Sequence, residues 1–460
     1  MPCHDVHSRI IGIAVQNLTN HFKQRWNYAN YEYNQLRTLS SKQDYLINQN
    51  NIILNNNDNI LYETNEKKII LFKENEEIDL NISNESLDKN NTLINEKYKK
   101  YFTEDIPPSN VQILRSASNW NTGITKREHS ILDTYYRLIE EAKHYIYIEN
   151  QFFISKSWNE EEREDSEDCI NDIVKNKIAY YIRKRIERAY KKNKKFKVYI
   201  FIPLLPGFKG DPEDSISIKV ILKYTYASIN RNFGLSIIEQ LEKIMGDKWT
   251  NYLGFFSLRN HGIINNIPKT EIIYIHSKIM IVDDKTVLIG SANINDRSML
   301  GDRDSELAAM IEEKEEFTNT KSRTKFIMNE KINYKAANFA VELRKALMAE
   351  HLGISQNAPI LDDPVSDKLF SLCLKRANNN SKIYHYIFGC YPDDDFRSFQ
   401  SIKDFDKIKK AEKPEYLLNK YNKYKDKIVG NIVEFPLLFL KDETLKTWAS
   451  ISQTITETFI

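Results

Sequence analysis

The sequence predicts an α/β fold in which helices pack on a sheet. Between residues 128 and 202, apolar residues at helical spacing alternate with short apolar runs, as in chains that form helix and strand in turn. Between residues 271 and 290, two runs rich in β-branched residues flank a short polar turn, which indicates a hairpin. The length of 460 residues suggests two or three domains with a large core.

Composition excludes several classes of protein. The formal net charge of +2 argues against bulk electrostatic binding to nucleic acid, which needs a far more basic domain. The sequence has no apolar run long enough to span a membrane and no secretory signal pattern at its start. The cysteines lack metal-ligand spacing and are typical of reduced thiols, so we expect a cytoplasmic protein: Cys3, Cys169, Cys373 and Cys390.

The segment 48–104 differs from the rest of the chain. Residues 48–95 hold 14 asparagines and show neither the helical nor the strand period. We therefore predict a disordered, low-complexity insertion and assign it no chemistry.

Beyond this insertion, the periodicity predicts regular elements in alternation. We expect a strand over Val111–Ser116 and then a helix over Glu128–His144. A strand over Tyr145–Ile148 follows, leading into Asn150 and Gln151, for which we predict hydrogen-bonded amides at the end of a core strand. Further elements are expected at Ile170–Lys192 (helix), Phe196–Ile202 (strand) and Ala336–Leu352 (helix, stopped by Gly353).

The hairpin carries the candidate site. Side chains two apart on a strand share a face, so we expect His276 and Lys278 to point together and Ser277 to point away. Histidine offers a base or nucleophile that titrates near neutrality, at about 6.5 when unperturbed. The ammonium of Lys278 offers fixed positive charge to phosphate oxygens. Asp283 has the wrong sign for that task, and we expect it to hold the turn or neighbouring backbone.

Polar residues follow the second strand of the hairpin. Gly290 allows close backbone approach, and Ser291 and Asn293 are expected to open a helix whose N–H groups face an anion. The pattern therefore predicts a phosphate site, with substrate ligands Ser291 and Asn293. Its catalytic residues are predicted to be His276, Lys278 and Asp283.

The pattern His-x-Lys-x4-Asp, followed after six residues by Gly-Ser-x-Asn, resembles the HKD signature of the phospholipase D superfamily. The run from Asn293 to Gly301, ending in Asp304-Ser305-Glu306, is similar to the eukaryotic phosphatidylcholine-hydrolysing enzymes rather than to the bacterial nucleases or cardiolipin synthases. Residues 1–30 resemble the segment that follows the first HKD motif in these enzymes, with Cys3 in place of their tryptophan. The sequence contains a single copy of the HKD pattern.

The resemblance implies a phospholipase D-like α/β/α sandwich with one complete HKD half. On this basis residues 1–47 are a remnant of the first half, 105–354 the second half and 355–460 the C-terminal lobe. It also implies that an acidic residue from the opposite half orients each histidine. Asp5 would then serve His276, and Glu306 would serve the histidine of the first motif. For each of these carboxylates, a capping or solvated role is the alternative.

The implied reaction is hydrolysis of phosphatidylcholine or a related glycerophospholipid to phosphatidic acid and choline. It proceeds through a phosphohistidine, with transphosphatidylation as a side activity and no obligatory cofactor. The resemblance is compatible with regulation by phosphoinositide or Ca²⁺. The implied partners are a phospholipid substrate and a peripheral membrane surface. The lysines at 191–197 form either a solvated helix end or a contact for anionic headgroups.

The single HKD pattern leaves three hypotheses. The chain is a portion of a longer phospholipase D, or two copies pair about a twofold axis and each contributes His276. In the third, a non-enzymatic regulatory protein binds lipid phosphate without turnover.

Overall fold

The computed structural model describes residues 2–8, 10, 14–40, 109–162, 172–313, 336–410 and 413–445, with three short strands between 52 and 70. The chain divides into two compact units, Met1–Leu18 with Pro108–Ile460, and Thr19–Pro107. The first of these is the larger unit, and it contains every predicted site residue.

The second unit contains part of α1 (Ala14–Ser40) and a small antiparallel sheet. Its strands are β2 (Ile52–Leu54), β3 (Ile60–Thr64) and β4 (Lys67–Ile70). We expected no regular structure here, and the structure differs at these three places, where isoleucines and other strand-forming residues interrupt the asparagines. The rest of the predicted insertion lies outside the described residues.

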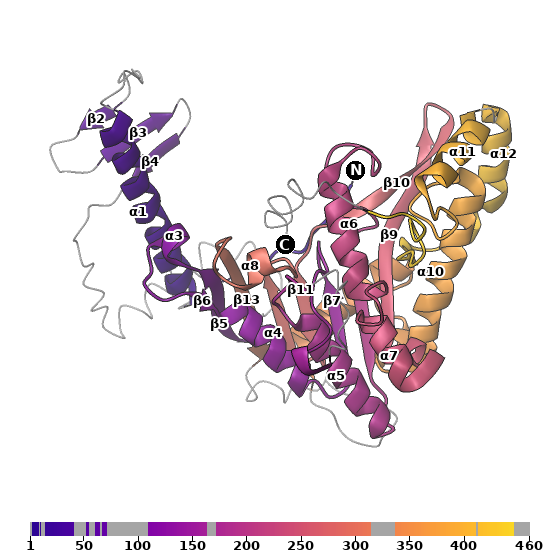
Figure 1. The fold of residues 1–460 in the computed structure, drawn as a ribbon, viewed down its shortest axis with the longest axis horizontal. Coiled ribbons are helices and arrows are strands. Elements are labelled where there is room, and N and C mark those ends of the chain that lie inside the picture. Colours follow the sequence, from indigo (N-terminus) through magenta and orange to yellow (C-terminus); the bar gives the residue numbers. More distant parts are fainter. Residues whose placement is uncertain are drawn as a thin grey trace. The chain divides into compact units, whose positions relative to one another are not determined.

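The larger unit is built on one mixed sheet (Figure 1). Its strands are β1 (Cys3–His4), β5 (Ser109–Ala117), β6 (Glu128–His129), β7 (Tyr145–Glu149), β8 (Lys197–Phe201), β9 (Leu253–Ile264), β10 (Ile267–Ile275), β11 (Ile279–Val282), β12 (Thr286–Gly290), β13 (Glu306–Glu313) and β14 (Ile432–Glu434). Hydrogen bonds place them in the order β1-β10-β9-β8-β7-β11-β12-β13-β5-β6, with β14 beside β9. Strands β7, β8 and β9 run parallel, whereas β11, β12, β13 and β5 pair antiparallel.

Helices of the same unit follow the strands along the chain. They are α3 (Asn119–Thr122), α4 (Ser130–Glu141), α5 (Ile178–Lys191), α6 (Ile216–Ile229), α7 (Ile237–Met245), α8 (Asp296–Met299), α9 (Asn338–Leu352), α10 (Asp367–Phe388), α11 (Phe399–Lys410) and α12 (Pro414–Tyr424). Short 3-10 turns occupy Glu160–Glu162, Gly246–Asn251, Pro359–Asp362 and Lys425–Lys427. As predicted, Gly353 ends α9 with a left-handed backbone, at a φ of 61°.

Helices cover both faces of the central strands. Ile146 and Ile148 of β7 belong to one hydrophobic cluster with the inner residues of α4, α5, α6 and α7. Tyr145 and Tyr147, which alternate with them, belong to another cluster with residues of α9 and α10. Because both faces of a strand are buried, it reads as an apolar run rather than an alternating one. The predicted α/β/α sandwich is confirmed.

The predicted helix at 170–192 is shorter than its apolar spacing indicated. It begins at Ile178, because residues 172–177 are held in another conformation. Asn176 donates from its backbone and side chain to Asp296, at 2.8 Å in both cases, and Val174 packs with Phe152 and Ile154 instead of with α5. The long-range hydrogen bonds from Asn176 to Asp296 therefore outweigh the helical spacing of the apolar residues before Ile178.

Candidate active site

His276, Ser277 and Lys278 lie between two strands, not on a continuous one as we predicted. β10 ends at Ile275 and pairs with β9, whereas β11 begins at Ile279 and pairs with β7 and β12. The backbone N–H groups of His276 and Ser277 donate to the carbonyl of His4, at 2.8 and 3.3 Å. The chain changes its neighbouring strands at this point, so the alternation of side chains between the two faces of a single strand does not apply.

Asp5 lies against the predicted catalytic histidine. Its Oδ2 is 2.9 Å from Nδ1 of His276, whose side chain is 46% exposed. Burial raises the pKa of Asp5, but the bonds from His276 and the Val6 N–H outweigh it, so the pKa lies below its usual value. An ionised Asp5 accepts only, so Nδ1 of His276 donates this hydrogen bond, which in a neutral imidazole leaves the lone pair on Nε2. The side chain of His276 is therefore oriented and accessible.

Lys278 lies beside this pair but is largely buried. Its Nζ donates to the backbone carbonyl of His276 at 2.5 Å, so the two predicted residues are brought together. Burial lowers the pKa of Lys278 to about 8, and the charges of Asp5 and Glu306 oppose that shift. The ammonium is therefore still charged near neutrality, close to the histidine.

Asp283 lies at the other end of β11. Its carboxylate accepts backbone N–H groups from Lys143, His144 and Tyr145, at 2.6 to 2.9 Å. The turn itself has positive φ angles at Asp283 and Asp284, as in a type I′ hairpin. The carboxylate thus fixes the start of β7 against the turn, one strand length away from His276.

The segment after β12 is a loop, not the start of a helix. The short helix α8 begins only at Asp296, so the predicted helix opening at Ser291 is wrong. The N–H of Ser291 donates to the Leu307 carbonyl, and that of Ile294 donates to Asn150. The close approach predicted at Gly290 is confirmed, because a Cβ there would lie 2.3 Å from the Leu307 carbonyl oxygen.

Ser291 and Asn293 lie in this loop, and they differ in whether their side-chain oxygens form hydrogen bonds. The Ser291 hydroxyl donates to Glu306, which also accepts from Ser298 at 2.8 Å. Burial raises the pKa of Glu306, and the two serine bonds oppose the rise. Among the described residues, the buried Oδ1 of Asn293 has no hydrogen-bond partner.

The side-chain amides of Asn150 and Gln151 are hydrogen-bonded at the end of a core strand, as predicted. Asn150 Oδ1 accepts the N–H groups of Phe152 and Ile294, at 3.1 and 3.0 Å. Gln151 donates to the Tyr274 hydroxyl at 2.8 Å, and the Tyr274 ring stacks on His276 with centroids 6.4 Å apart.

Sequence reasoning missed a buried hydrogen-bond network around Glu149, next to the segment 276–278. Glu149 is fully buried and accepts from His4, Ser277, Tyr147 and His351. One signal was present: a carboxylate at the end of the apolar strand 145–149 shares the tyrosine face and needs partners when buried. Which partners it has depends on residues up to 202 positions away.

The same network is one of three clusters of potential metal ligands in the described part of the chain. Its members are His4, Glu149 and His351, and the Nε2–O distances of 2.9 and 2.8 Å are those of hydrogen bonds. Both Glu149 oxygens also accept a hydroxyl at 2.5 Å. These contacts already use the lone pairs that an ion would need.

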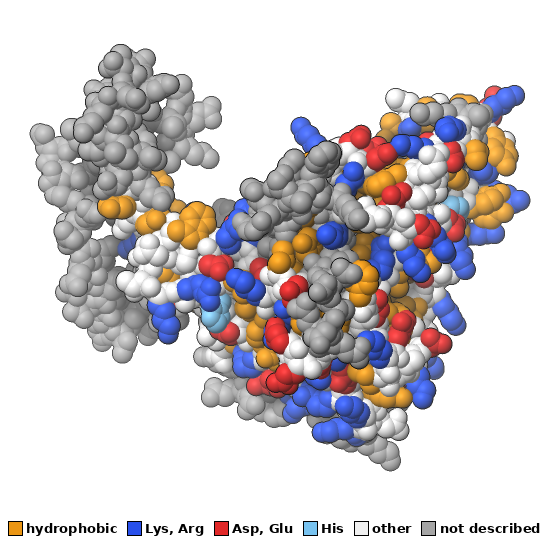
Figure 2. Space-filling model, in the orientation of Figure 1, with side chains coloured by type: hydrophobic (Ala, Val, Ile, Leu, Met, Phe, Trp, Pro, Cys, Tyr) orange, Lys and Arg blue, Asp and Glu red, His pale blue; other side chains and the backbone are white. Residues whose placement is uncertain are grey.

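The basic cluster at 191–197 lies away from this site. Figure 2 shows Lys and Arg side chains at the lower edge of the larger unit, where Figure 1 places the end of α5. Residues around it, including Lys143 and His144, border a hollow of about 730 Å³ at the start of β7. Lys195 and Lys197 both pair with Asp367, at 3.0 and 2.8 Å. The cluster is separated from Ser277 by the length of β7, about 16 Å.

Comparison with known proteins decides the family. A family model described as PLDc, Phospholipase D, matches residues 1–388. The chain belongs to the phospholipase D family. Mouse Phospholipase D1 is 36% identical over 450 residues, which cover 97% of this chain and 36% of that protein. Bovine Phospholipase D2 is 41% identical over 341 residues, which cover 73% of this chain and 34% of that protein.

A plant relative extends the comparison. Phospholipase D zeta 2 of Arabidopsis thaliana is 38% identical over 298 residues, covering 64% of this chain and 27% of that protein. The resemblance to eukaryotic HKD phospholipases D is therefore confirmed, and the chain spans about a third of the length of these relatives. Within the described residues, no helix has the length and apolarity needed to cross a bilayer.

Proposed function

We propose that the protein is a phospholipase D that hydrolyses phosphatidylcholine or a related glycerophospholipid to phosphatidic acid and choline. The observation that supports this most directly is the exposed His276, held at Nδ1 by Asp5 and lying beside the Lys278 ammonium. An oriented imidazole next to a fixed cation suits attack on a phosphodiester.

The proposed reaction has two displacements at phosphorus. One histidine attacks phosphorus and the P–O bond to choline breaks, while a second histidine gives its proton to the choline oxygen. The second histidine then takes a proton from water, whose oxygen attacks phosphorus and releases the first histidine. An acceptor alcohol in place of water gives transphosphatidylation.

We assign His276 the acid and base role, because in the superfamily that the chain resembles the upstream histidine usually attacks. The bond from Asp5 to Nδ1 and the exposed ring leave Nε2 accessible, which suits either role. Lys278, Ser291 and Asn293 are proposed to bind the phosphate oxygens, and Asp283 to hold the hairpin. Glu306 is proposed to orient the second histidine. That histidine comes either from another HKD motif in the same protein or from a second copy of this chain. Because the substrate lies in a bilayer, we propose peripheral membrane association.

Choline release from phosphatidylcholine vesicles tests this function. The protein expressed from its complete coding sequence should release choline, and His276→Ala should lose at least about 10³-fold in kcat. Full release by His276→Ala would remove the catalytic assignment. Release by residues 1–460 alone, rising with dimer concentration, would favour paired copies. Sulfate binding without release in either form would favour a regulatory protein.

A further inference from the structure

The two oxygens of Glu149 bind different parts of the molecule. Oε2 accepts from His4 Nε2 at 2.9 Å and from the Ser277 hydroxyl at 2.5 Å. Oε1 accepts from the Tyr147 hydroxyl at 2.5 Å and from His351 Nε2 at 2.8 Å. The four donors use all the acceptor sites of one carboxylate.

The two residues that donate to Oε2 are sequence neighbours of Asp5 and His276. His4 precedes Asp5, and Ser277 follows His276. The backbone carbonyl of the same His4 also accepts the N–H groups of His276 and Ser277. One carboxylate oxygen therefore connects the two segments whose side chains meet as Asp5 and His276.

Apolar contacts also hold the segment that carries Asp5, because the partly buried Val6 and Ile10 pack against the core. Its strand β1 has two residues and, in the part of the chain that the structure describes, pairs with β10 through Tyr274 and Ile275. A two-residue strand adds little stability by itself. The buried bond from His4 to Glu149 is therefore a polar anchor for this strand, beside those apolar contacts, and a longer 3.5 Å contact joins His4 to Glu350.

The anchor is an ion pair inside the protein. Burial lowers the pKa of His4, but the bonds to Glu149 and Glu350 outweigh it and raise the pKa to about 10. Burial raises the pKa of Glu149, but the bonds from His351 and His4 hold it well below its usual range. Both groups are thus charged at neutral pH, and a buried charge restricts its partners to a narrow geometry.

We propose that Glu149 is a positioning residue that sets the Asp5–His276 pair by tying His4 and Ser277 to one oxygen. Glu149 does not itself contact the phosphate. The proposal rests on the proposed role of His276, and it adds a residue from a third segment of the chain to the determinants of the rate.

Two variants separate positioning from general stability in the protein expressed from its complete coding sequence. Glu149→Gln replaces acceptor lone pairs with N–H donors and should lower kcat by about 10- to 100-fold with little change in KM. Tyr147→Phe removes a donor from the other oxygen, Oε1, and should leave kcat within about twofold of wild type. Thermal melting of both variants reports how much stability each loses.

A rescue pair tests the link through His4. His4→Gln places an amide N–H near the position of Nε2 and should retain more kcat than His4→Ala. If both variants lose kcat equally, the bond from His4 does not position the site, and the proposal is overturned.

The spectroscopic readout is the tautomer of His276, measured by ¹⁵N NMR on residues 1–460. Wild type and Tyr147→Phe should show the Nδ1–H tautomer, and Glu149→Gln should show a mixture. An unchanged tautomer in Glu149→Gln, or equal kcat losses in Glu149→Gln and Tyr147→Phe, would overturn the proposal. Because this readout needs no turnover, it stands even if His276→Ala retains activity and the proposed function fails.

Discussion

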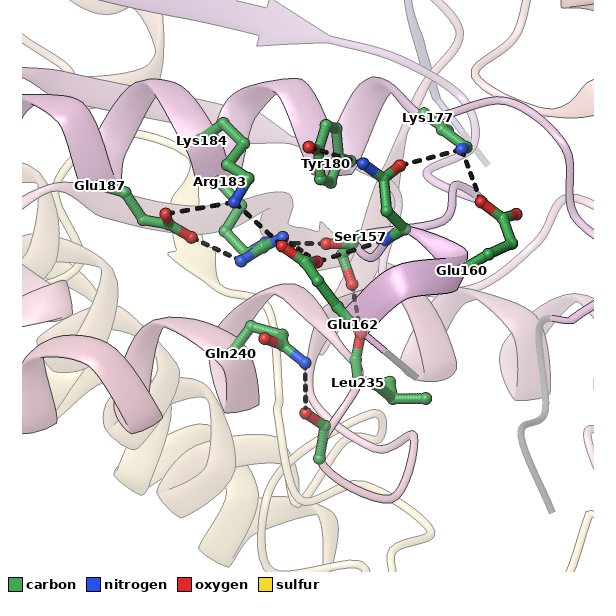
Figure 3. Close-up of polar contacts among 12 residues, drawn as sticks. Ser157, Glu160, Glu162, Lys177, Tyr180, Arg183, Lys184, Glu187, Leu235 and Gln240 are labelled. Carbon is green, nitrogen blue, oxygen red and sulfur yellow. Dashed lines mark hydrogen bonds and ion pairs between the residues drawn. The ribbon is translucent and has the colours of Figure 1, made fainter. Parts of the chain in front are cut away.

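Two buried charged networks in the larger unit differ in what they connect. Around Glu149, the donors come from residues 128 to 202 positions away, apart from Tyr147. Around Arg183, Figure 3 shows ligands from α5 and the loop before it. The guanidinium donates to the Ser157 carbonyl at 2.8 Å and to Glu162 and Glu187 at 2.5 Å each, none more than 26 positions away.

The difference between these two networks shows that a buried charged group is not necessarily a functional one. Arg183 fastens one helix to the adjacent 3-10 turn, a task that Lys177 repeats through Glu160. Glu149 joins the N-terminal segment, the break between β10 and β11, and α9. Loss of the first network should cost stability alone, whereas loss of the second should also cost rate.

The largest expected effect comes from breaking each network in turn. Glu149→Gln and Arg183→Met should each destabilise the fold by roughly 3–5 kcal/mol, because each leaves buried partners uncompensated. At a temperature where both remain folded, Arg183→Met should keep kcat within about twofold of wild type, whereas Glu149→Gln should not. Calorimetry and choline release on the same samples measure both. Equal kcat losses would make the two networks equivalent.

The ion pair of His4 predicts a pH dependence of stability. Because the pKa of His4 is raised from 6.5 to about 10 in the fold, its contribution is complete below 6.5 and is lost as pH rises through 10. Wild type should therefore lose on the order of a few kcal/mol over this interval relative to His4→Gln. Urea unfolding at pH 6, 8 and 10 compares the two. Parallel curves would count against a charged His4.

A smaller effect is expected at the cation of the site. The pKa of Lys278 is about 8, so its positive charge is lost above that pH. Sulfate, whose own charge is constant in this range, should bind residues 1–460 about tenfold more weakly at pH 9 than at pH 7. Titration calorimetry provides the affinity. Lys278→Met should bind weakly at both pH values, and a wild-type affinity that does not change would contradict the assignment.

The smallest effect sharpens the comparison within the Glu149 network. Tyr147→Phe deletes one of four bonds and should cost about 1 kcal/mol of stability. Glu149 should stay ionised, because both histidine bonds remain. A loss as large as that of Glu149→Gln, measured by urea unfolding, would show that the tyrosine rather than the histidines holds the carboxylate.

Much of the fold could be predicted because its signals are local. The helix at α4, the strands β7 and β8, the hairpin of β11 and β12, and the end of α9 at Gly353 all follow from period and turn residues. The start of α5 could not, because Asn176 is held by Asp296 across 120 positions. Likewise, the break at 276–278 arises because the chain leaves β9 and joins β7, and no local pattern encodes that exchange.

The candidate site shows the same division. His276 and Lys278 were found by spacing, and Asp5 by resemblance to a family. His4, Glu149 and His351 were missed because each looks ordinary in its own segment: a residue of a two-residue strand, a strand end and a helix face. Their role depends on mutual contacts that form only when the chain folds.

A crystal structure of Glu149→Gln beside wild type tests the central claim most directly, through the distance from Asp5 Oδ2 to His276 Nδ1. That distance is 2.9 Å in the wild-type structure. We expect it to exceed about 3.5 Å in the variant, beyond hydrogen-bond range, while the ligands of Arg183 stay in place. An Asp5–His276 pair that remains at hydrogen-bond distance would contradict the account.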